Sequence, residues 1–147
     1  MDQVDRQILA ALVTDGRLTF HQLAATVHLS ATATADRVRR LRAVGVLSGY
    51  HASVDLEVLG YELQAMSDVK VHETIARSDF EAHLAGIPEV LSAIHTTGEY
   101  DYQLRVVTTG PADLERIIDE LRAAGVREIH SRIVLGETIF NPTRLLG

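Results

Sequence analysis

The sequence contains no cysteine and no tryptophan, and only three of its 147 residues are proline. Without cysteine the chain can form no disulfide, no thiolate metal site and no cysteine nucleophile, so we expect a protein of the reducing cytoplasm. It also lacks an apolar run of the roughly 18 residues that a membrane span needs, and its charged first residues do not resemble an export signal. The 46% hydrophobic and 23% charged residues that are present are typical of a globular protein with a core.

The formal net charge of -6 argues against a protein that coats nucleic acid without selectivity. The charge is unevenly distributed, however. Residues 1–60 carry six basic and six acidic residues, whereas residues 61–147 carry eight basic and fourteen acidic ones. Within the neutral part, Arg37, Arg39, Arg40 and Arg42 fall in six residues. A basic strip on an otherwise acidic chain favours docking of DNA at one place.

Hydrophobic residues recur at helical spacing in three segments of the first 45 residues. Thr19 and Gln22 form a capping box at the start of the second segment. Ser30 is a good N-cap for the third, and Gly45 lies where a left-handed residue ends a helix. The segments are residues 2–14, 19–28 and 30–45. We therefore predict three helices, the last two joined by a tight turn.

The pattern changes after these helices. Residues 46–54 are typical of an extended linker strand, and the polar stretch that ends at Gly60 marks a domain boundary. Beyond it we expect strands at residues 65–71, 90–96, 102–108 and 126–140. Between them we expect a helix opened by Ser78 and Glu81 as a capping box, and another that begins at Pro111. The fold class is then α+β: a three-helix domain at residues 1–60, followed at residues 61–147 by a ferredoxin-like βαββαβ αβ-sandwich.

The two helices of such a sandwich cover only one face of its sheet. Because the predicted strands are rich in apolar residues, the other face would expose an apolar patch on the order of several hundred Å². We expect a second copy of the chain to cover it, and therefore a homodimer.

A short helix, a tight turn and a second helix with arginines on its polar side predict a helix-turn-helix unit that binds double-stranded DNA. Thr34, Val38 and Leu41 would pack inward, leaving small residues and arginines to face the major groove. Arg37 could read guanine or, like its neighbours, neutralise a phosphate. The predicted DNA-binding residues are Ser30, Ala31, Thr32, Ala33, Asp36, Arg37, Arg39, Arg40 and Arg42. The alternative is a merely solvated helix face.

Taken together, the residues resemble the Lrp/AsnC family, the feast/famine transcriptional regulators. The matching stretches run through nearly the whole sequence in order. They include Asp5 with Ile8-Leu9, Asp15-Gly16-Arg17, Leu29-Ser30, Arg37-Val38-Arg39-Arg40-Leu41, Gly45-Val46-Leu47, Pro88-Glu89-Val90, Thr97-Gly98-Glu99-Tyr100-Asp101-Tyr102 and Gly125-Val126. The resemblance implies a dimer formed through the sheet, assembly up to octamers, and an amino-acid effector bound between dimers. It implies no cofactor.

The chain departs from the family pattern in the turn between the DNA-binding helices. Where the family usually has glycine, this sequence has His28. A left-handed conformation at that position would strain the histidine backbone by about 1 kcal/mol.

The loop at residues 97–102 is similar to the family's effector loop, and residues 127–131 contribute to the same pocket in relatives. Backbone amides around Gly98 could hold an effector carboxylate, and Glu99 or Asp101 could pair with its ammonium group. The predicted effector-binding residues are Thr97, Gly98, Glu99, Tyr100, Asp101, Arg127 and Ser131. The alternative is that Gly98-Glu99 is only a hairpin turn.

Enzyme functions find little support. The seven histidines form no metal-ligand motif, and there is no glycine-rich phosphate loop, so we expect neither catalysis nor a metal site. One alternative is a siroheme-decarboxylase-like subunit, which shares the architecture and would use His95 or His130 around a tetrapyrrole. The intact arginine strip favours a regulator. A pure interaction module would leave that strip unexplained.

Overall fold

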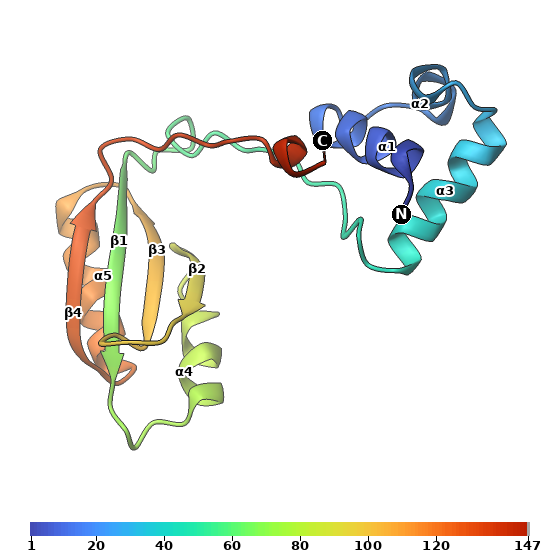
Figure 1. Cartoon of the computed structure of the whole chain (residues 1–147). Helices are drawn as coiled ribbons and strands as arrows, with labels where there is room; N and C mark the ends of the chain where they lie inside the picture. Colours follow the sequence, from blue (N-terminus) through green and yellow to red (C-terminus); the bar gives the residue numbers. More distant parts are fainter. Residues whose placement is uncertain (147) are drawn as a thin grey trace. The chain divides into compact units, whose positions relative to one another are not determined.

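The computed structural model describes residues 1–146, which form two compact units (Figure 1). The first unit consists of Met1–Ser53 together with the described residues from Thr138 on, and the second is Val54–Glu137. This division follows Ser53, ahead of the boundary predicted at residue 60. Within the described residues, no helix is long and apolar enough to cross a membrane.

The first unit contains the three predicted helices, α1 (Gln3–Thr14), α2 (Phe20–Val27) and α3 (Ala31–Ala43). The capping box of Thr19 and Gln22 is confirmed, because each side chain bonds the other's backbone amide. Ser30 Oγ accepts a hydrogen bond from Ala33 N at 3.2 Å, and Gly45 has a φ of 78°. The helices therefore begin and end close to the residues that the sequence predicted, and local hydrogen bonds and turn geometry fix these ends.

The C-terminal residues complete the core of this first unit. A short 3-10 helix, η1 (Pro142–Leu145), contacts α1, and Leu146 packs against the cluster of buried side chains inside the three helices. Asn141 caps η1 through a hydrogen bond of 2.8 Å from Thr143 N to its Oδ1. The central members of the cluster are Ile8, Leu9, Leu12, Leu23, Val27, Val38 and Leu41.

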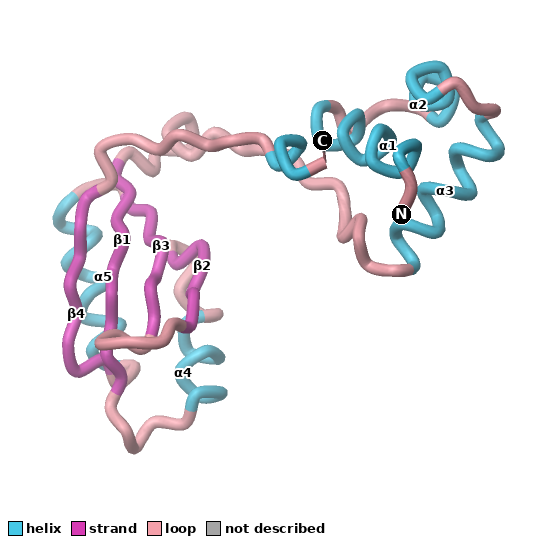
Figure 2. Tube along the Cα trace, viewed as in Figure 1, coloured by secondary structure: helices cyan, strands magenta, loops and turns pink. Residues whose placement is uncertain are grey.

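The second unit has the predicted βαββαβ order (Figure 2). Its elements are β1 (Leu63–Val71), α4 (Arg77–Leu84), β2 (Val90–His95), β3 (Tyr102–Thr108), α5 (Pro111–Ala123) and β4 (Val126–Ile133). The four strands form one antiparallel sheet in the order β2-β3-β1-β4. Both helices pack on the same face, where Phe80 and Ile117 meet Val69 and Leu104 in one apolar core.

The other face of the sheet is more polar than the sequence predicted. Side chains alternate along a strand, so the residues between the buried positions of β1 and β3 point to this open face. They are linked by polar contacts, such as Gln103 to Asp68 at 3.0 Å and Arg105 to Gln64 at 3.0 Å. The expectation of a broadly apolar bare face was therefore wrong, because the apolar residues of these strands are concentrated on the helix side.

Three local predictions also need correction. Residues 46–54 form no strand, because no segment of the described chain pairs with their backbone. The last strand ends at Ile133 rather than at residue 140, where pairing with β1 ends. The helix α4 begins at Arg77 with no side-chain cap, because its N-cap residue is Ala76; Ser78 lies inside the helix, where its Oγ donates to the carboxylate of Asp79 at 3.3 Å.

Candidate nucleic-acid interface and ligand pocket

The helix α3 presents the face that the sequence predicted. Thr34, Val38 and Leu41 are buried, and Thr34 Oγ1 donates to the carbonyl of Ser30 at 2.9 Å. The exposed side includes Thr32 and the arginine strip, and the side chains over residues 31–36 are all short. A helix with such a surface can approach the floor of a major groove closely.

The turn between α2 and α3 contains the expected backbone strain. His28 has φ 54° and ψ 43°, and it is the one described residue other than glycine with a positive φ. Its backbone amide bonds the carbonyl of Ala24, and Leu29 N donates to the same carbonyl at 3.1 Å. The turn therefore has the left-handed geometry that ends a helix, with a cost of about 1 kcal/mol for a side chain there.

Two arginines of the strip contact α1 instead of facing solvent freely. Asp5 Oδ1 accepts from Arg37 Nη1 at 2.8 Å, and Asp5 Oδ2 accepts from Arg40 Nη2 at 2.9 Å. Arg37 Nη1 also donates to Asp2 Oδ2 at 2.7 Å. The Asp5 side chain is only 2% exposed. We call these four residues, Asp2, Asp5, Arg37 and Arg40, the acid clamp.

The electrostatics of the acid clamp favour its charged form. Burial by itself would raise the pKa of Asp5, but the backbone amide of Asp2 and the two guanidinium groups lower it below the ordinary value. The hydrogen bond from Arg37 likewise lowers the pKa of Asp2, and the hydrogen bond to Asp2 raises the pKa of Arg37. The cluster is therefore a neutral set of two carboxylates and two guanidinium groups.

The prediction of DNA-binding residues missed the acid clamp. The position of Asp5 in the sequence could have indicated it. Asp5 lies four and seven residues before Leu9 and Leu12, so it belongs to the apolar stripe of α1. Arg37 lies next to Val38 on the helix that packs against this stripe. A carboxylate on a buried stripe needs a cation, because an unpaired buried charge is strongly unfavourable.

The remaining arginines of the strip stay accessible. Arg39 pairs with Asp36 on its own helix, at 2.6 Å, and both side chains are more than half exposed. Arg42 is exposed and has no ion-pair partner within residues 1–146. Exposed pairs of this kind contribute little, so both guanidinium groups are available to an external anion.

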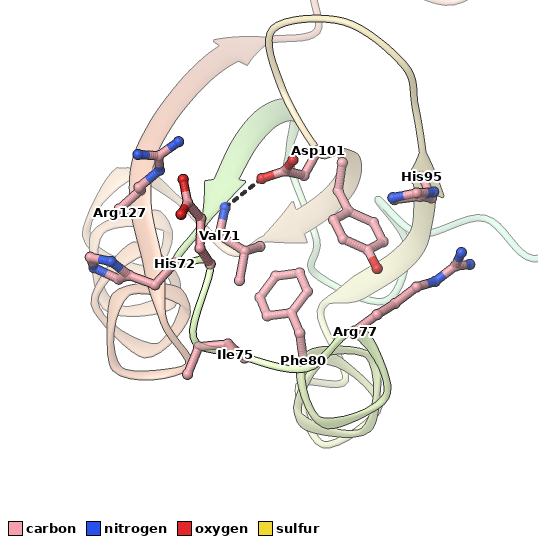
Figure 3. A pocket seen from close by; sticks show the side chains of 10 residues that line it. Val71, His72, Ile75, Arg77, Phe80, His95, Asp101 and Arg127 are labelled. Atoms are coloured by element: carbon pink, nitrogen blue, oxygen red, sulfur yellow. Dashed lines mark hydrogen bonds between the residues drawn. The ribbon is translucent and has the colours of Figure 1, made fainter.

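In the second unit, a cavity of about 260 Å³ lies at the end of β1, between the loop before β3 and the start of α4 (Figure 3). Phe80, Ile75 and Val71 form its apolar wall. Its polar rim consists of His72, Glu73, Arg77, His95, Asp101, Tyr102 and Arg127. Ligand pockets usually measure roughly 300–1,000 Å³, so this cavity fits a molecule of amino-acid size rather than a large cofactor.

Two of the predicted effector residues line this cavity. Asp101 Oδ2 accepts a hydrogen bond from Val71 N at 2.8 Å, which fixes the carboxylate at the rim. Its other carboxylate oxygen has no hydrogen-bond partner within the described chain, and neither has the guanidinium group of Arg127. A free carboxylate oxygen and a free guanidinium group thus border one cavity.

The opposite side of the cavity is held by side-chain hydrogen bonds and ring contacts. Tyr102 donates its hydroxyl to Glu81 Oε1 at 2.9 Å, and Arg77 Nε donates to the same oxygen at 2.7 Å. The bond from Arg77 lowers the pKa of Glu81, and burial raises the pKa of Tyr102. The Tyr102 ring also lies against Phe80 and His95, with centroids 5.2 and 4.9 Å away.

The other predicted effector residues lie elsewhere. Glu99 and Tyr100 surround Lys70, whose Nζ is 3.1 Å from Glu99 Oε1 and 4.9 Å from the centre of the Tyr100 ring. Ser131 bonds Ser67 at 2.7 Å. Thr97 and Gly98 are exposed in the loop. The sequence prediction of the effector site missed the rim residues from α4 and from the end of β1. These residues lie far from the loop at residues 97–102 in the sequence, and only the fold brings them close to it.

The two histidines of the tetrapyrrole alternative do not converge. His95 pairs with Tyr102, whose ring lies on the helix side of the sheet. His130 pairs with Asp68 on the open face, and its Nδ1 is 3.1 Å from the Tyr100 hydroxyl. The described residues contain no group of three or more potential metal ligands. The two histidines therefore lie on opposite faces of the sheet.

Comparisons with known proteins agree with the geometry of both units. Residues 1–42 match the AsnC-type helix-turn-helix domain, and residues 64–143 match the Lrp/AsnC ligand binding domain. The chain is 35% identical over 140 residues to the HTH-type transcriptional regulator Rv2324 of Mycobacterium tuberculosis, with 95% of each chain covered. It is 31% identical to the HTH-type transcriptional regulator FL11 of Pyrococcus horikoshii, covering 92% of this chain and 89% of the relative.

Solved structures are similar over nearly the whole chain. The transcriptional regulator NMB0573 of Neisseria meningitidis, in complex with L-Met, superposes with a TM-score of 0.89 at 32% identity, covering 97% of this chain and 95% of that one. The feast or famine regulatory protein Rv3291c of M. tuberculosis, complexed with L-methionine, gives a TM-score of 0.86 at 33% identity, with 95% of each chain covered. None of these four relatives has an enzyme name.

Proposed function

The chain belongs to the Lrp/AsnC family of transcriptional regulators, and from this premise we propose that it docks α3 in DNA and responds to an amino acid held beside Asp101. The observation that carries the DNA half is the exposed surface of α3, where short side chains are followed by the accessible arginines Arg39 and Arg42. Because regulation of transcription takes place on DNA, we place the protein in the cytoplasm.

The proposed DNA interface follows from exposure and charge. The residues Ser30, Ala31, Thr32, Ala33 and Asp36 lie on the first turns of α3 or its cap, where a recognition helix meets base edges. Arg39 and Arg42 are further along the helix and can reach phosphates. Arg37 and Arg40 lie beside them with their guanidinium groups on Asp5. The interface thus has a base-reading start and a phosphate-binding end.

We propose that the working form contains at least two copies of the chain. Large apolar side chains are exposed along the two segments that connect the units, including Val54, Val58, Leu135, Ile139 and Phe140. A monomer that exposed all of them would be prone to association. The open face of the sheet also holds a cavity of about 330 Å³ lined in part by Met66, Ile94 and Val134. A second copy that covers these surfaces would produce a dimer.

Two recognition helices in a symmetric dimer meet successive turns of the major groove, about 34 Å apart. Selection of bound fragments from a random DNA pool is therefore expected to enrich an imperfect palindrome with that spacing. The DNA half of the proposal fails if no sequence is enriched over several rounds by a protein whose folding has been verified.

The proposed effector is a zwitterionic amino acid. Its ammonium group would pair with the free oxygen of Asp101, its carboxylate with Arg127, and its side chain would contact Phe80 and Ile75. L-Methionine, the ligand named in two of the related structures, has an apolar side chain that suits such a wall. The amino acid would change the assembly state or the DNA affinity of the protein only if two assembly states bind it with different affinities.

Asp101→Ala is expected to abolish any rise in melting temperature that an amino acid causes in the wild-type protein. Ligand that binds only the folded state at 100 times its dissociation constant stabilises it by about 2.7 kcal/mol, so the loss is measurable by thermal shift. Asp101→Asn keeps an oxygen for Val71 N but removes the charge, and it should also abolish the rise.

Glu99→Ala is the matched control, since Glu99 lies on the same loop but pairs with Lys70. It should retain the amino-acid-dependent rise. A screen of the twenty amino acids identifies the ligand first. A full rise in Asp101→Asn would exclude the carboxylate from the binding site, whereas its loss in Glu99→Ala would move the site to the Lys70 side.

A further inference from the structure

Asp5 is buried and cannot contact DNA itself, but through the acid clamp it acts on two arginines of α3. We infer that Asp5 is a positioning residue for recognition: it holds Arg37 and Arg40 against α1, so that Arg39 and Arg42 supply the phosphate contacts of α3. The inference rests on the proposed docking of α3 in DNA. It assigns different functions to arginines that are neighbours in the sequence.

The Asp5 carboxylate is saturated with hydrogen-bond donors. Oδ1 accepts from Arg37 at 2.8 Å and from Arg40 at 3.0 Å. Oδ2 accepts from Arg40 at 2.9 Å and from the backbone amide of Asp2 at 3.1 Å. Because the side chain is 2% exposed, water cannot replace a guanidinium group that leaves. A move of Arg37 or Arg40 to a phosphate would strip a buried carboxylate of donors, which is strongly unfavourable.

The exposed arginines of the strip have no such anchor. The Arg37 and Arg40 side chains are 27% and 57% exposed but both bond the buried Asp5, whereas Arg39 is 71% exposed and, within the described residues, bonds only Asp36. The acid that pairs with Arg39, Asp36, is itself 60% exposed, so water replaces the guanidinium group at little cost. Arg42 has no ion pair within the described residues, so no such pair has to break when it binds a phosphate. A phosphate therefore attracts Arg39 and Arg42 with less competition from the protein.

The clamp also limits non-specific binding. Affinity for any DNA sequence rises with the number of phosphates that cations neutralise. By neutralising two of the four arginines of the strip, Asp2 and Asp5 reduce this sequence-independent attraction. The fixed guanidinium groups also hold α3 at a constant angle to α1, so the base-reading residues at the start of α3 keep their geometry. Both effects favour selected sites over bulk DNA.

Asp5→Asn tests the inference with little change of shape. The amide removes the negative charge, which frees Arg40 to seek phosphates and leaves Arg37 with only the half-exposed carboxylate of Asp2. Since each phosphate contact contributes about 0.9 to the slope of log affinity against log salt, the slope on random-sequence DNA should steepen by about 1 to 2 for each bound recognition helix. The ratio of specific to non-specific affinity should fall by about tenfold or more.

Asp15→Asn is the matched control. It makes the same change of charge in the first unit, and Asp15 Oδ1 accepts from the backbone amide of Arg17, at 2.9 Å, rather than from a guanidinium group. Its salt slope should stay at the wild-type value. A slope in Asp5→Asn equal to that of Asp15→Asn, in a protein whose circular dichroism is native, would overturn the inference.

Arg40→Ala keeps the inference testable if Asp5→Asn does not fold. Its salt slope on DNA should equal that of the wild type, whether or not Asp5→Asn folds. Where Asp5→Asn does fold, Asp5→Asn/Arg40→Ala should have a shallower slope than Asp5→Asn. A slope lowered by about 1 in Arg40→Ala would show that Arg40 contacts a phosphate, which contradicts the assigned function. If instead the wild-type protein binds no DNA, the proposed function fails and not only the function of Asp5.

Discussion

Replacing both Arg39 and Arg42 with alanine is expected to weaken DNA binding by about 100-fold for each docked recognition helix, which corresponds to roughly 1.4 kcal/mol for each lost charged hydrogen bond. The reason is their accessibility. Arg39 is 71% exposed, and Arg42 has no ion-pair partner within the described residues. Fluorescence anisotropy over a range of salt concentrations should also show a slope shallower by about 2 for each docked helix.

The control for this experiment is Arg122→Ala. Arg122 lies on α5 in the second unit, is 61% exposed and pairs with Asp119. Removing it changes the net charge without touching α3, so the slope should not change. An Arg39→Ala/Arg42→Ala protein with wild-type slope and affinity would exclude this part of α3 from the phosphate contacts.

The second large effect is expected from Gly125→Ala, which should lower the free energy of unfolding of the second unit by about 3 kcal/mol, the sum of two costs. Gly125 has a φ of +103°, where a side chain costs about 1–2 kcal/mol. A Cβ atom there would also lie 2.7 Å from Ile75 Cγ1, and such overpacking typically costs about 1–3 kcal/mol. Ile75 Cδ1 and Cβ would lie 3.3 and 3.7 Å from the same atom, so the whole side chain of Ile75 has to shift.

Gly60→Ala separates the two contributions. Gly60 has a φ of +91° but no atom within 4 Å of a Cβ, so only the backbone cost should remain. Urea unfolding followed by tyrosine fluorescence reports mainly on the second unit, because Tyr61, Tyr100 and Tyr102 lie within it. Equal losses in the two variants would contradict the clash with Ile75.

Since Ile75 forms part of the apolar wall of the cavity, Gly125→Ala also has a functional consequence. A displaced Ile75 would change the shape of the wall, and the amino-acid-dependent rise in melting temperature should diminish even where the variant is folded. Gly60→Ala should keep that rise. The pair thus connects a backbone requirement to the proposed effector site.

The fold was predictable where local rules decide it. The capping box of Thr19 and Gln22, the N-cap Ser30 and the proline at the start of α5 act through neighbours in sequence, and all are confirmed. The buried stripe of Thr34, Val38 and Leu41 follows from helical periodicity alone. These features were enough to predict the helix-turn-helix and the βαββαβ order without any tertiary information.

Predictions were incomplete where other residues compete. Ser78 does not cap α4, since the helix begins one residue before it and its N-cap position is Ala76. The strand after α5 ends with the pair of Ala65 and Ile133 in its ladder with β1, which periodicity within one segment cannot reveal. The contact of Arg37 with Asp5 was missed, because Asp5 lies 32 positions earlier in the sequence. The cavity was only half predicted, because α4 contributes one of its sides.

Residues 138–146 belong to the first unit, and this limits which recombination events can transfer that unit between genes. Leu146 completes a core whose other members come from the first 50 residues, so the first unit is not a contiguous block of the chain. A recombination event at one point between the units would transfer α1 to α3 without the segment that packs on α1. Exchange of the DNA-binding unit between relatives therefore requires that both of its coding segments are transferred together. Otherwise, other apolar residues have to fill the place of Leu146 in the core.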